Sequence, residues 1–273
     1  MLEYSREALA EFIRVEARTS NGSITSFYGG DQSWFESENG RAGGCGTVAA
    51  ANILAYFGVV LGVDGAFGSS APVLDSRHLK QADYLAHMHQ VYGGLTPLVP
   101  PWKSMTRFHQ GRGDGGSRGG RRSILKLPDS LGIHSPVRFA NAVVVLAQKQ
   151  EVELRPVWPL SGTVRWSAGQ RLSLSQAKAF ILGQVEKGFP VAMLNFNNRG
   201  LRQVDYQSVV SGRTFTTDRF QWHWVVVTGV ETDERTGRDA IIVSSWGNRV
   251  ALDLDRFWGR GLSYLVSFEV RSR

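Results

Sequence analysis

The sequence predicts an α+β fold in which a helical lobe packs on an antiparallel β lobe. Segments with helical periodicity dominate the first part of the 273 residues, and apolar strand-like runs follow one another after residue 190. With 42% hydrophobic residues the chain can bury a substantial core. We therefore predict one domain over 1–273, with the helical lobe at about 1–150 and the β lobe at about 151–273.

The predicted helices have periodic apolar faces and recognisable starts. Ser5 can cap a first helix, Ser135-Pro136 opens a later one, and Ser173 begins a capping box. The segment from Thr47 is apolar nearly all round, which is typical of a helix in the middle of a domain. We predict helices at 5–17, 47–56, 77–91, 136–147 and 174–187, the third with Leu79, Ala82, Leu85 and His89 on its inner face.

The predicted strands are short apolar runs bounded by turn residues. The polar segment 232–238 between two of them indicates a hairpin loop, and the proline-rich segment 95–102 indicates an extended strap. We predict strands at 24–28, 152–157, 191–196, 222–230, 240–246, 250–254 and 263–270.

The net charge of +7 raises the question of an anionic partner. Most of the charge is dispersed, and the sequence has no zinc-knuckle, RNP or helix-turn-helix signature, so we predict no nucleic-acid partner. Residues 111–122 contain six glycines and four arginines, which predicts a flexible loop. A contact between this loop and an anionic partner or substrate is the alternative.

Other composition signals limit the compartment and the cofactors. Segment 42–63 is uncharged, but glycines near its start and Asn52 in its middle favour a buried helix over a membrane span. The first residues lack a signal-peptide pattern, so we expect a cytoplasmic protein, with leaderless export as an open alternative. The single cysteine fits a reducing compartment, and the spacing of His87 and His89 suits no metal pair, so we expect no metal or cofactor.

Two segments contain residue types that nucleophilic catalysis uses. Cys45, the only cysteine, lies where a glycine-rich loop at 39–46 is predicted to enter the buried helix. A helix N-terminus lowers the pKa of a thiol, although an inert core cysteine is the alternative. His223 lies in an apolar strand, and a hairpin near Glu234 would bring Ser244 to Asn248 beside it. A side chain there could orient the imidazole as a catalytic base requires.

These segments resemble the motifs of papain-like cysteine peptidases, a clan that includes the bacterial C39-like peptidases. The family motif Q-G-x-C-G-S-C is similar to Asn39-Gly40-Arg41-Ala42-Gly43-Gly44-Cys45, H-x-V-x-x-x-G to the segment from His223 to Gly229, and N-S-W-G to Ser244-Ser245-Trp246-Gly247. The resemblance implies that Cys45 is the nucleophile, His223 the general base and Asn39 an oxyanion-hole amide. It also implies that Ser244, or Asn248 in its place, orients His223, and that Trp246 shields the pair.

The function implied by this resemblance is hydrolysis of a peptide or isopeptide bond by a Cys-His thiolate–imidazolium pair. The partner is then a peptide or protein substrate bound in a cleft between the two lobes. Transfer of the acyl group to an amine on the same residues is one alternative. A papain-like binding module without activity is another, and it is motivated by the departures from the family pattern at Asn39 and Ser244.

Overall fold

The computed structural model describes most of the chain around a central sheet. The described residues are 12–68, 78–98, 132–159, 172–196, 204–207, 214–217, 220, 222–232, 239–254, 258 and 262–271. The predicted loop at 111–122 and its suggested anionic contact, the start of the first predicted helix, the second half of the strap at 95–102 and residues 233–238 of the predicted hairpin loop lie outside these residues.

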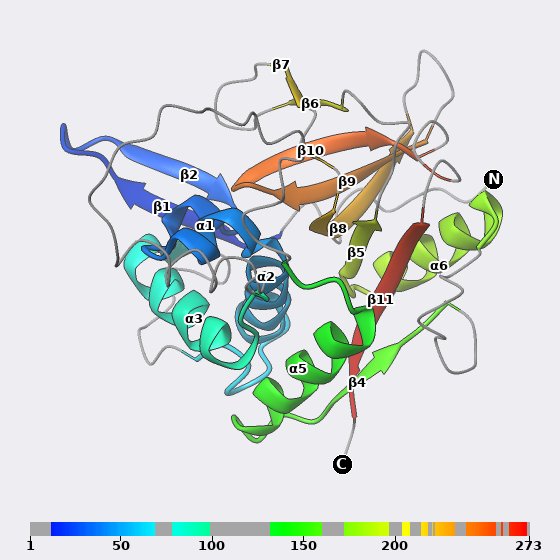
Figure 1. Ribbon diagram of the computed structural model, residues 1–273, viewed down its shortest axis with the longest axis horizontal. Helices are drawn as coiled ribbons and strands as arrows, with labels where there is room; N and C mark the ends of the chain where they lie inside the picture. The colour runs from blue at the N-terminus through cyan, green and yellow to red at the C-terminus, as the bar shows by residue number, and fades with distance from the viewer. Residues whose placement is uncertain are drawn as a thin grey trace, which may run out of the picture.

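A six-stranded sheet with strand order β10-β9-β8-β5-β11-β4 forms the centre of the fold (Figure 1). Every neighbouring pair in it is antiparallel. Its strands are β4 (Leu154–Val157), β5 (Val191–Phe196), β8 (His223–Thr232), β9 (Asp239–Ser245), β10 (Asn248–Asp253) and β11 (Leu262–Val270). These bounds confirm the strands that the sequence predicts after residue 150, within a few residues at each end.

Helices cover both faces of this sheet. Ala192 and Leu194 of β5 point into a core shared with α2 (Cys45–Val59) and α5 (Pro136–Gln148), while Val191 and Met193 point into a second core under α6 (Leu174–Glu186). Successive side chains of a strand face opposite sides, so a strand covered twice is apolar at nearly every position. This explains the continuous apolar runs of β5 and β8. The combination of helices with an antiparallel sheet makes the fold α+β, as predicted.

Helix α2 lies between the sheet and the helices α3 (Gln81–Gly94) and α5 (Figure 1). Nearly all of its side chains are buried, because it has protein on several sides and its alanines allow close approach. Gly46 is part of that approach, since a Cβ there would lie 3.0 Å from both Trp224 of β8 and Ile133. The predicted helix from Thr47 is therefore confirmed and begins two residues earlier.

The N-terminal part contains two strands, β1 and β3, that the sequence pattern does not predict. Residues Arg14–Arg18 form strand β1, so the predicted helix at 5–17 is wrong over its described last turn. β1 pairs with β2 (Ile24–Tyr28), which was predicted, and in parallel with β3 (His78–Lys80). Backbone hydrogen bonds to two segments outweigh the local helical periodicity, so the first half of the chain is a mixed rather than a purely helical lobe.

One further helix and the start of another also differ from the prediction. The glycine-rich stretch before Cys45 is not a loop but helix α1 (Glu38–Gly43), whose N-cap Ser37 accepts a hydrogen bond from the Gly40 N–H. Helix α3 begins at Gln81 rather than 77, because β3 occupies the preceding residues. Its buried face differs accordingly and consists of Tyr84, His87, Met88 and Val91.

The capped helices follow the sequence closely. Ser135 caps α5 through the Arg138 N–H, and Ser173 forms the full capping box with Gln176 at the start of α6. The remaining described elements are the 3-10 helix η1 (Gln32–Trp34) and the hairpin of β6 (Val204–Gln207) with β7 (Thr214–Thr217).

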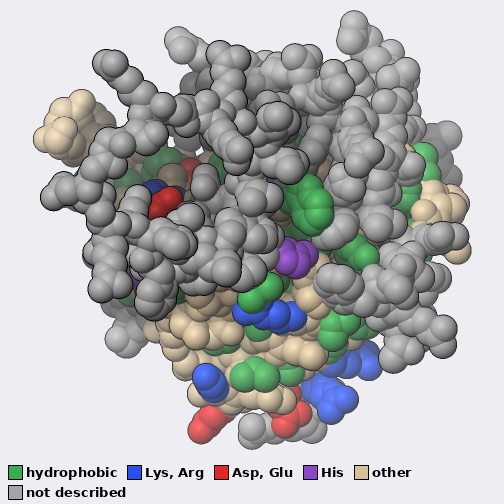
Figure 2. All heavy atoms as spheres, in the orientation of Figure 1, with side chains coloured by type: hydrophobic (Ala, Val, Ile, Leu, Met, Phe, Trp, Pro, Cys, Tyr) green, Lys and Arg blue, Asp and Glu red, His purple; other side chains and the backbone are tan. Residues whose placement is uncertain are grey.

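None of the described helices is long and apolar enough to cross a membrane. Lys and Arg side chains lie in several separate places on the face in Figure 2.

Candidate active site

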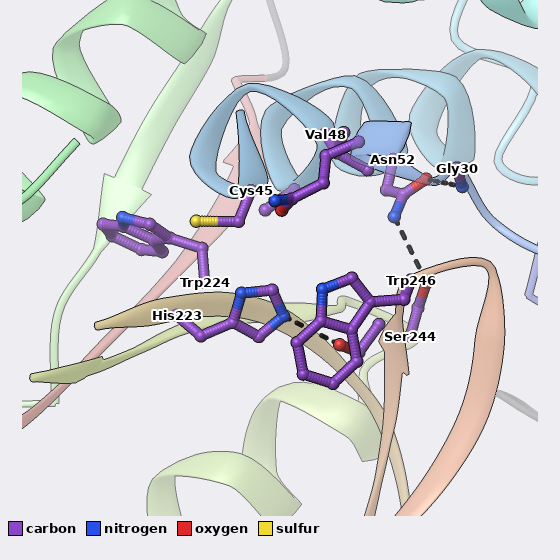
Figure 3. Close-up of a pocket in the computed structure, with 11 residues that line it drawn as sticks. Gly30, Cys45, Val48, Asn52, His223, Trp224, Ser244 and Trp246 are labelled. Atoms are coloured by element: carbon purple, nitrogen blue, oxygen red, sulfur yellow. Dashed lines mark hydrogen bonds between the residues drawn. The ribbon is translucent and has the colours of Figure 1, made fainter. Parts of the chain in front are cut away.

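A small cavity lies where α2 begins, β8 begins, and the β9–β10 turn meets the loop after β2 (Figure 3). Its volume is about 10 Å³, which is the space that one water molecule needs. Cys45, His223, Ser245 and Trp246 are among its lining residues, together with Gln32. Residues from opposite ends of the sequence therefore meet at one point.

Cys45 is the first residue of α2, with Gly44 as N-cap. Its side chain is 8% exposed and points from the helix toward β8 (Figure 3). Burial raises the pKa of the thiol, while hydrogen bonds from the backbone N–H groups of Trp224, Gly46 and Cys45 itself act in the opposite direction. Helix N-termini stabilise negative charge, so this position suits sulfur that becomes anionic during a reaction.

His223 is the first residue of β8 and is held from two directions. Its Nε2 lies 2.8 Å from Ser245 Oγ, and the Trp246 ring stacks on the imidazole at 4.2 Å between centroids and 16° between planes. Phe220 contacts the same ring edge-on. Burial lowers the pKa of His223 to about 3, so the imidazole is neutral over most of the pH range.

The stacking of Trp246 depends on an unusual turn. Trp246 and Gly247 have φ of 48° and 67°, and they connect the paired residues Ser245 and Asn248. Two positive φ angles are the mark of a type I′ hairpin, in which a tryptophan is strained. Trp222 on the other side of His223 also has a positive φ, of 58°. Strained residues thus flank the imidazole in sequence and in space.

The residue that holds His223 differs from the prediction. Ser244 Oγ donates to Tyr28 O at 2.7 Å, and Asn248 Nδ2 donates to Trp246 O at 2.7 Å. Neither side chain is the partner of the imidazole, which is bonded to Ser245. Adjacent residues of a strand point to opposite sides, so only one of the two serines can face His223.

The side-chain amide that lies at the cavity also differs from the prediction. Asn39 lies in α1, its Nδ2 donates to Pro97 O at 3.1 Å, and it does not line the cavity. Gln32 of η1 lines it instead. Its Nε2 donates to Arg41 O at 2.7 Å, and its Oε1 is buried with no hydrogen-bond partner in the described structure. The sequence does not predict a role for Gln32, because its only local signal is the turn of Gly29-Gly30-Asp31 that η1 follows.

The other described histidines lie outside this cavity. His87 is buried in α3, whereas His78 and His89 are more exposed. His134 packs edge-on against Trp222. His109 falls outside the described residues. Among the side chains that the structure describes, no group of three or more His, Cys, Asp and Glu could hold a metal ion.

No family model matches this chain, and comparisons with curated proteins and with solved structures found no match either.

Proposed function

We propose that this protein is a papain-like cysteine hydrolase that cleaves a peptide or isopeptide bond. The observation that carries the proposal is the joint lining of one cavity by Cys45 and His223, with the imidazole held by Ser245 and covered by Trp246. A nucleophile at a helix N-terminus, a base on a facing strand and an orienting side chain are the parts that thiol catalysis requires. The packing of α2 on an antiparallel sheet supports a papain-like arrangement.

In the proposed reaction Cys45 is the nucleophile, and His223 accepts and donates the protons in each step. The Cys45 thiol gives its proton to His223 Nδ1 as the sulfur attacks the carbonyl carbon, while Nε2 keeps its hydrogen bond to Ser245. The Cys45 N–H and the Gln32 amide, both from residues that line the cavity, would stabilise the oxyanion. His223 then protonates the leaving amine, which leaves a thioester on Cys45. Water, deprotonated by His223, attacks this thioester and releases the acid.

The resting pair is a neutral thiol and imidazole in this proposal, rather than the ion pair that the family resemblance implies. Burial raises the pKa of Cys45 and lowers that of His223, so both shifts oppose the ion pair. A cavity of about 10 Å³ also holds no peptide group. Substrate binding therefore has to widen the cavity, and proton transfer to His223 accompanies the attack.

A peptide digest tests the proposal directly. The full chain is incubated with a complex peptide mixture in a reducing buffer, and new peptide ends are identified by mass spectrometry. We expect cleavages that disappear with the Cys45→Ala variant. A second arm adds an excess of a primary amine, and amine-conjugated fragments would assign acyl transfer instead of hydrolysis. Cleavages that persist in Cys45→Ala would rule out Cys45 as the nucleophile.

The proposed compartment is the cytoplasm, because a reducing compartment keeps a single catalytic cysteine as a free thiol.

The neutral pair predicts an unusual pH profile. Because the pKa of His223 is lowered to about 3, the free enzyme keeps its base form far below the usual histidine range. We expect the acid limb of kcat/KM to have an apparent pKa well below 6, measured over the pH range in which circular dichroism shows the native fold. An acid limb between pH 6 and 7 would contradict the buried, neutral histidine.

Ser245→Ala is expected to reduce kcat about fivefold. The substitution removes the hydrogen bond to His223 Nε2, and a neutral hydrogen bond contributes about 1 kcal/mol. Ser267→Ala is the matched control, because Ser267 is also a buried serine of this sheet but donates to Pro190 O, away from the cavity. Equal kcat values for the two variants would show that Ser245 does not orient the imidazole.

A further inference from the structure

Asn52 is a buried amide in the middle of the otherwise apolar helix α2. It is 2% exposed, and both ends of its amide are hydrogen-bonded. Its Oδ1 accepts from the Gly30 N–H at 2.9 Å and from the Tyr84 hydroxyl at 2.5 Å. Its Nδ2 donates to Ser244 Oγ at 3.2 Å. One side chain of α2 thus contacts the loop after β2, helix α3 and the end of β9.

The directions of these hydrogen bonds follow from a single fixed donor. The Gly30 N–H can only donate, so the atom of Asn52 that it contacts is the oxygen, and the nitrogen faces Ser244. The Ser244 hydroxyl accepts from that nitrogen and donates its own proton to Tyr28 O at 2.7 Å. A buried network of this kind, with both the oxygen and the nitrogen of the amide hydrogen-bonded, favours one arrangement of the elements that it joins.

Two short routes lead from Asn52 to the imidazole, and Figure 3 shows the Asn52–Ser244 hydrogen bond with which the first begins. The first passes through Ser244 to its neighbour Ser245, which is bonded to His223. The second passes through Gly30, whose carbonyl accepts a hydrogen bond from the Gly247 N–H at 3.0 Å. Gly247 is the residue after Trp246, whose ring stacks on His223. Both groups that hold the imidazole are therefore one residue away from a partner in the Asn52 network.

The backbone at Gly29 and Gly30 packs tightly against the side chains of the Asn52 network. A Cβ at Gly29 would lie 2.6 Å from Ser244 Oγ and 2.8 Å from Asn52 Oδ1, and a Cβ at Gly30 would lie 2.5 Å from the Tyr84 ring. Gly29 also has a φ of 79°, which disfavours any other residue. Small shifts of α2 relative to the β9–β10 turn would therefore break contacts on several sides.

We infer that Asn52 is a positioning residue, which sets the place of the Cys45 helix relative to the His223 imidazole through Ser244 and Gly30. This inference rests on the proposed function, because it assigns Asn52 a role in the Cys45–His223 pair. Stability alone does not call for an amide here, since buried polar groups contribute little net stability compared with well-packed apolar ones. Displacing a reacting group by about 1 Å, in contrast, can cost about 100-fold in rate.

The experiment measures alkylation of Cys45 by iodoacetamide on the intact protein as a function of pH. The difference between the wild-type rate and the His223→Ala rate is the part of the reactivity that depends on the imidazole. Asn52→Asp keeps the shape of the side chain but removes its donor to Ser244, and Ser244→Ala removes the acceptor. Tyr56→Phe is the matched control, because Tyr56 is also on α2 and its hydroxyl donates to Gly188 O, away from the cavity.

We expect both network variants to lose about tenfold or more of the imidazole-dependent rate, with pH profiles that approach that of His223→Ala. Tyr56→Phe should keep the wild-type profile. If Asn52→Asp does not fold, as judged by thermal unfolding, the milder Ser244→Ala decides. Wild-type profiles in the folded network variants overturn the inference. The inference is also overturned if the network substitutions change the alkylation rate by the same factor in the presence and absence of His223, because such a change means only that the cavity is more open.

The same measurements separate this inference from the proposed function. If wild type and His223→Ala react alike at every pH, Cys45 and His223 do not act as a pair, and the proposed function fails first. If wild type exceeds His223→Ala while Asn52→Asp and Ser244→Ala match wild type, the pair stands and only the positioning role of Asn52 is lost.

Discussion

Replacing Cys45 by alanine is expected to lower hydrolysis of any substrate found for this protein by about 10⁴-fold or more, because the substitution removes the atom that forms the thioester in the proposed mechanism. His223→Ala should cost nearly as much, since a thiol whose pKa is raised by burial cannot lose its proton without a base. In that mechanism the two groups act in the same step, so the double variant should be no slower than the slower single variant. Initial rates on the peptide identified in the digest measure all three.

The control for these variants removes a buried polar group of the same helix without touching the cavity. Thr47 Oγ1 donates to Leu95 O at 2.7 Å, and Thr47 does not line the cavity. Thr47→Val should therefore lower the free energy of unfolding but leave kcat within about twofold of wild type, as expected for a site with no shared partners. Additive losses in the Cys45→Ala, His223→Ala double variant would contradict a common step, and a loss as large in Thr47→Val would show that activity only follows stability.

Much of the fold follows from local sequence signals. Ser135-Pro136 and the Ser173 capping box mark helix starts that the structure confirms, because a cap acts within one turn of its own helix. The strands β5 and β8 contain continuous apolar runs, because helices cover both faces of the sheet at these central strands. The first predicted helix fails at Arg14–Arg18, where pairing with two distant segments decides the structure, and no local pattern reports such pairing.

The candidate site shows the same division between local and distant effects. The two chemically distinctive residues, Cys45 and His223, are predictable because their residue types and order are informative by themselves. The choice of Ser245 over Ser244 is not predictable, since it depends on strand register. The pairing of β8 with β9 is irregular between Val227 and Gly229, and a shift of one residue exchanges the side chains on the two faces of a strand.

The Gln32 and Asn39 positions differ for a related reason. Spacing before Cys45 favours Asn39 by analogy with the family motif, but α1 forms in that stretch and directs the Asn39 amide to Pro97 O. Asp31 caps η1 through the Ser33 N–H, and this turn places Gln32 at the cavity. Two short helices, η1 and α1, therefore decide which side-chain amide lines the cavity. The glycine-rich sequence of α1 makes that helix hard to predict.

Acidification is expected to destabilise the fold strongly through His87. Burial lowers the pKa of His87 from 6.5 to about 4, so the unfolded chain binds a proton that the folded protein rejects. Stability from this group is present above pH 6.5 and is lost as the pH falls toward 4. The shift corresponds to a loss of about 3 kcal/mol. Urea unfolding between pH 7.5 and pH 4 measures it, and His223, whose pKa is also lowered, contributes in the same direction.

The hydrogen bonds of His87 explain why protonation cannot be accommodated. Nδ1 accepts from the Gly68 N–H at 3.2 Å, so the proton of the neutral ring is on Nε2, which donates to Ala51 O at 3.1 Å. A second proton, on Nδ1, would point at the Gly68 N–H, which cannot accept a hydrogen bond. His87→Asn should therefore lower stability at pH 7 but flatten its decline toward pH 4 by about 3 kcal/mol. Thr47→Val should instead lower stability equally at each pH. A decline as steep in His87→Asn as in wild type would show that other groups control acid unfolding.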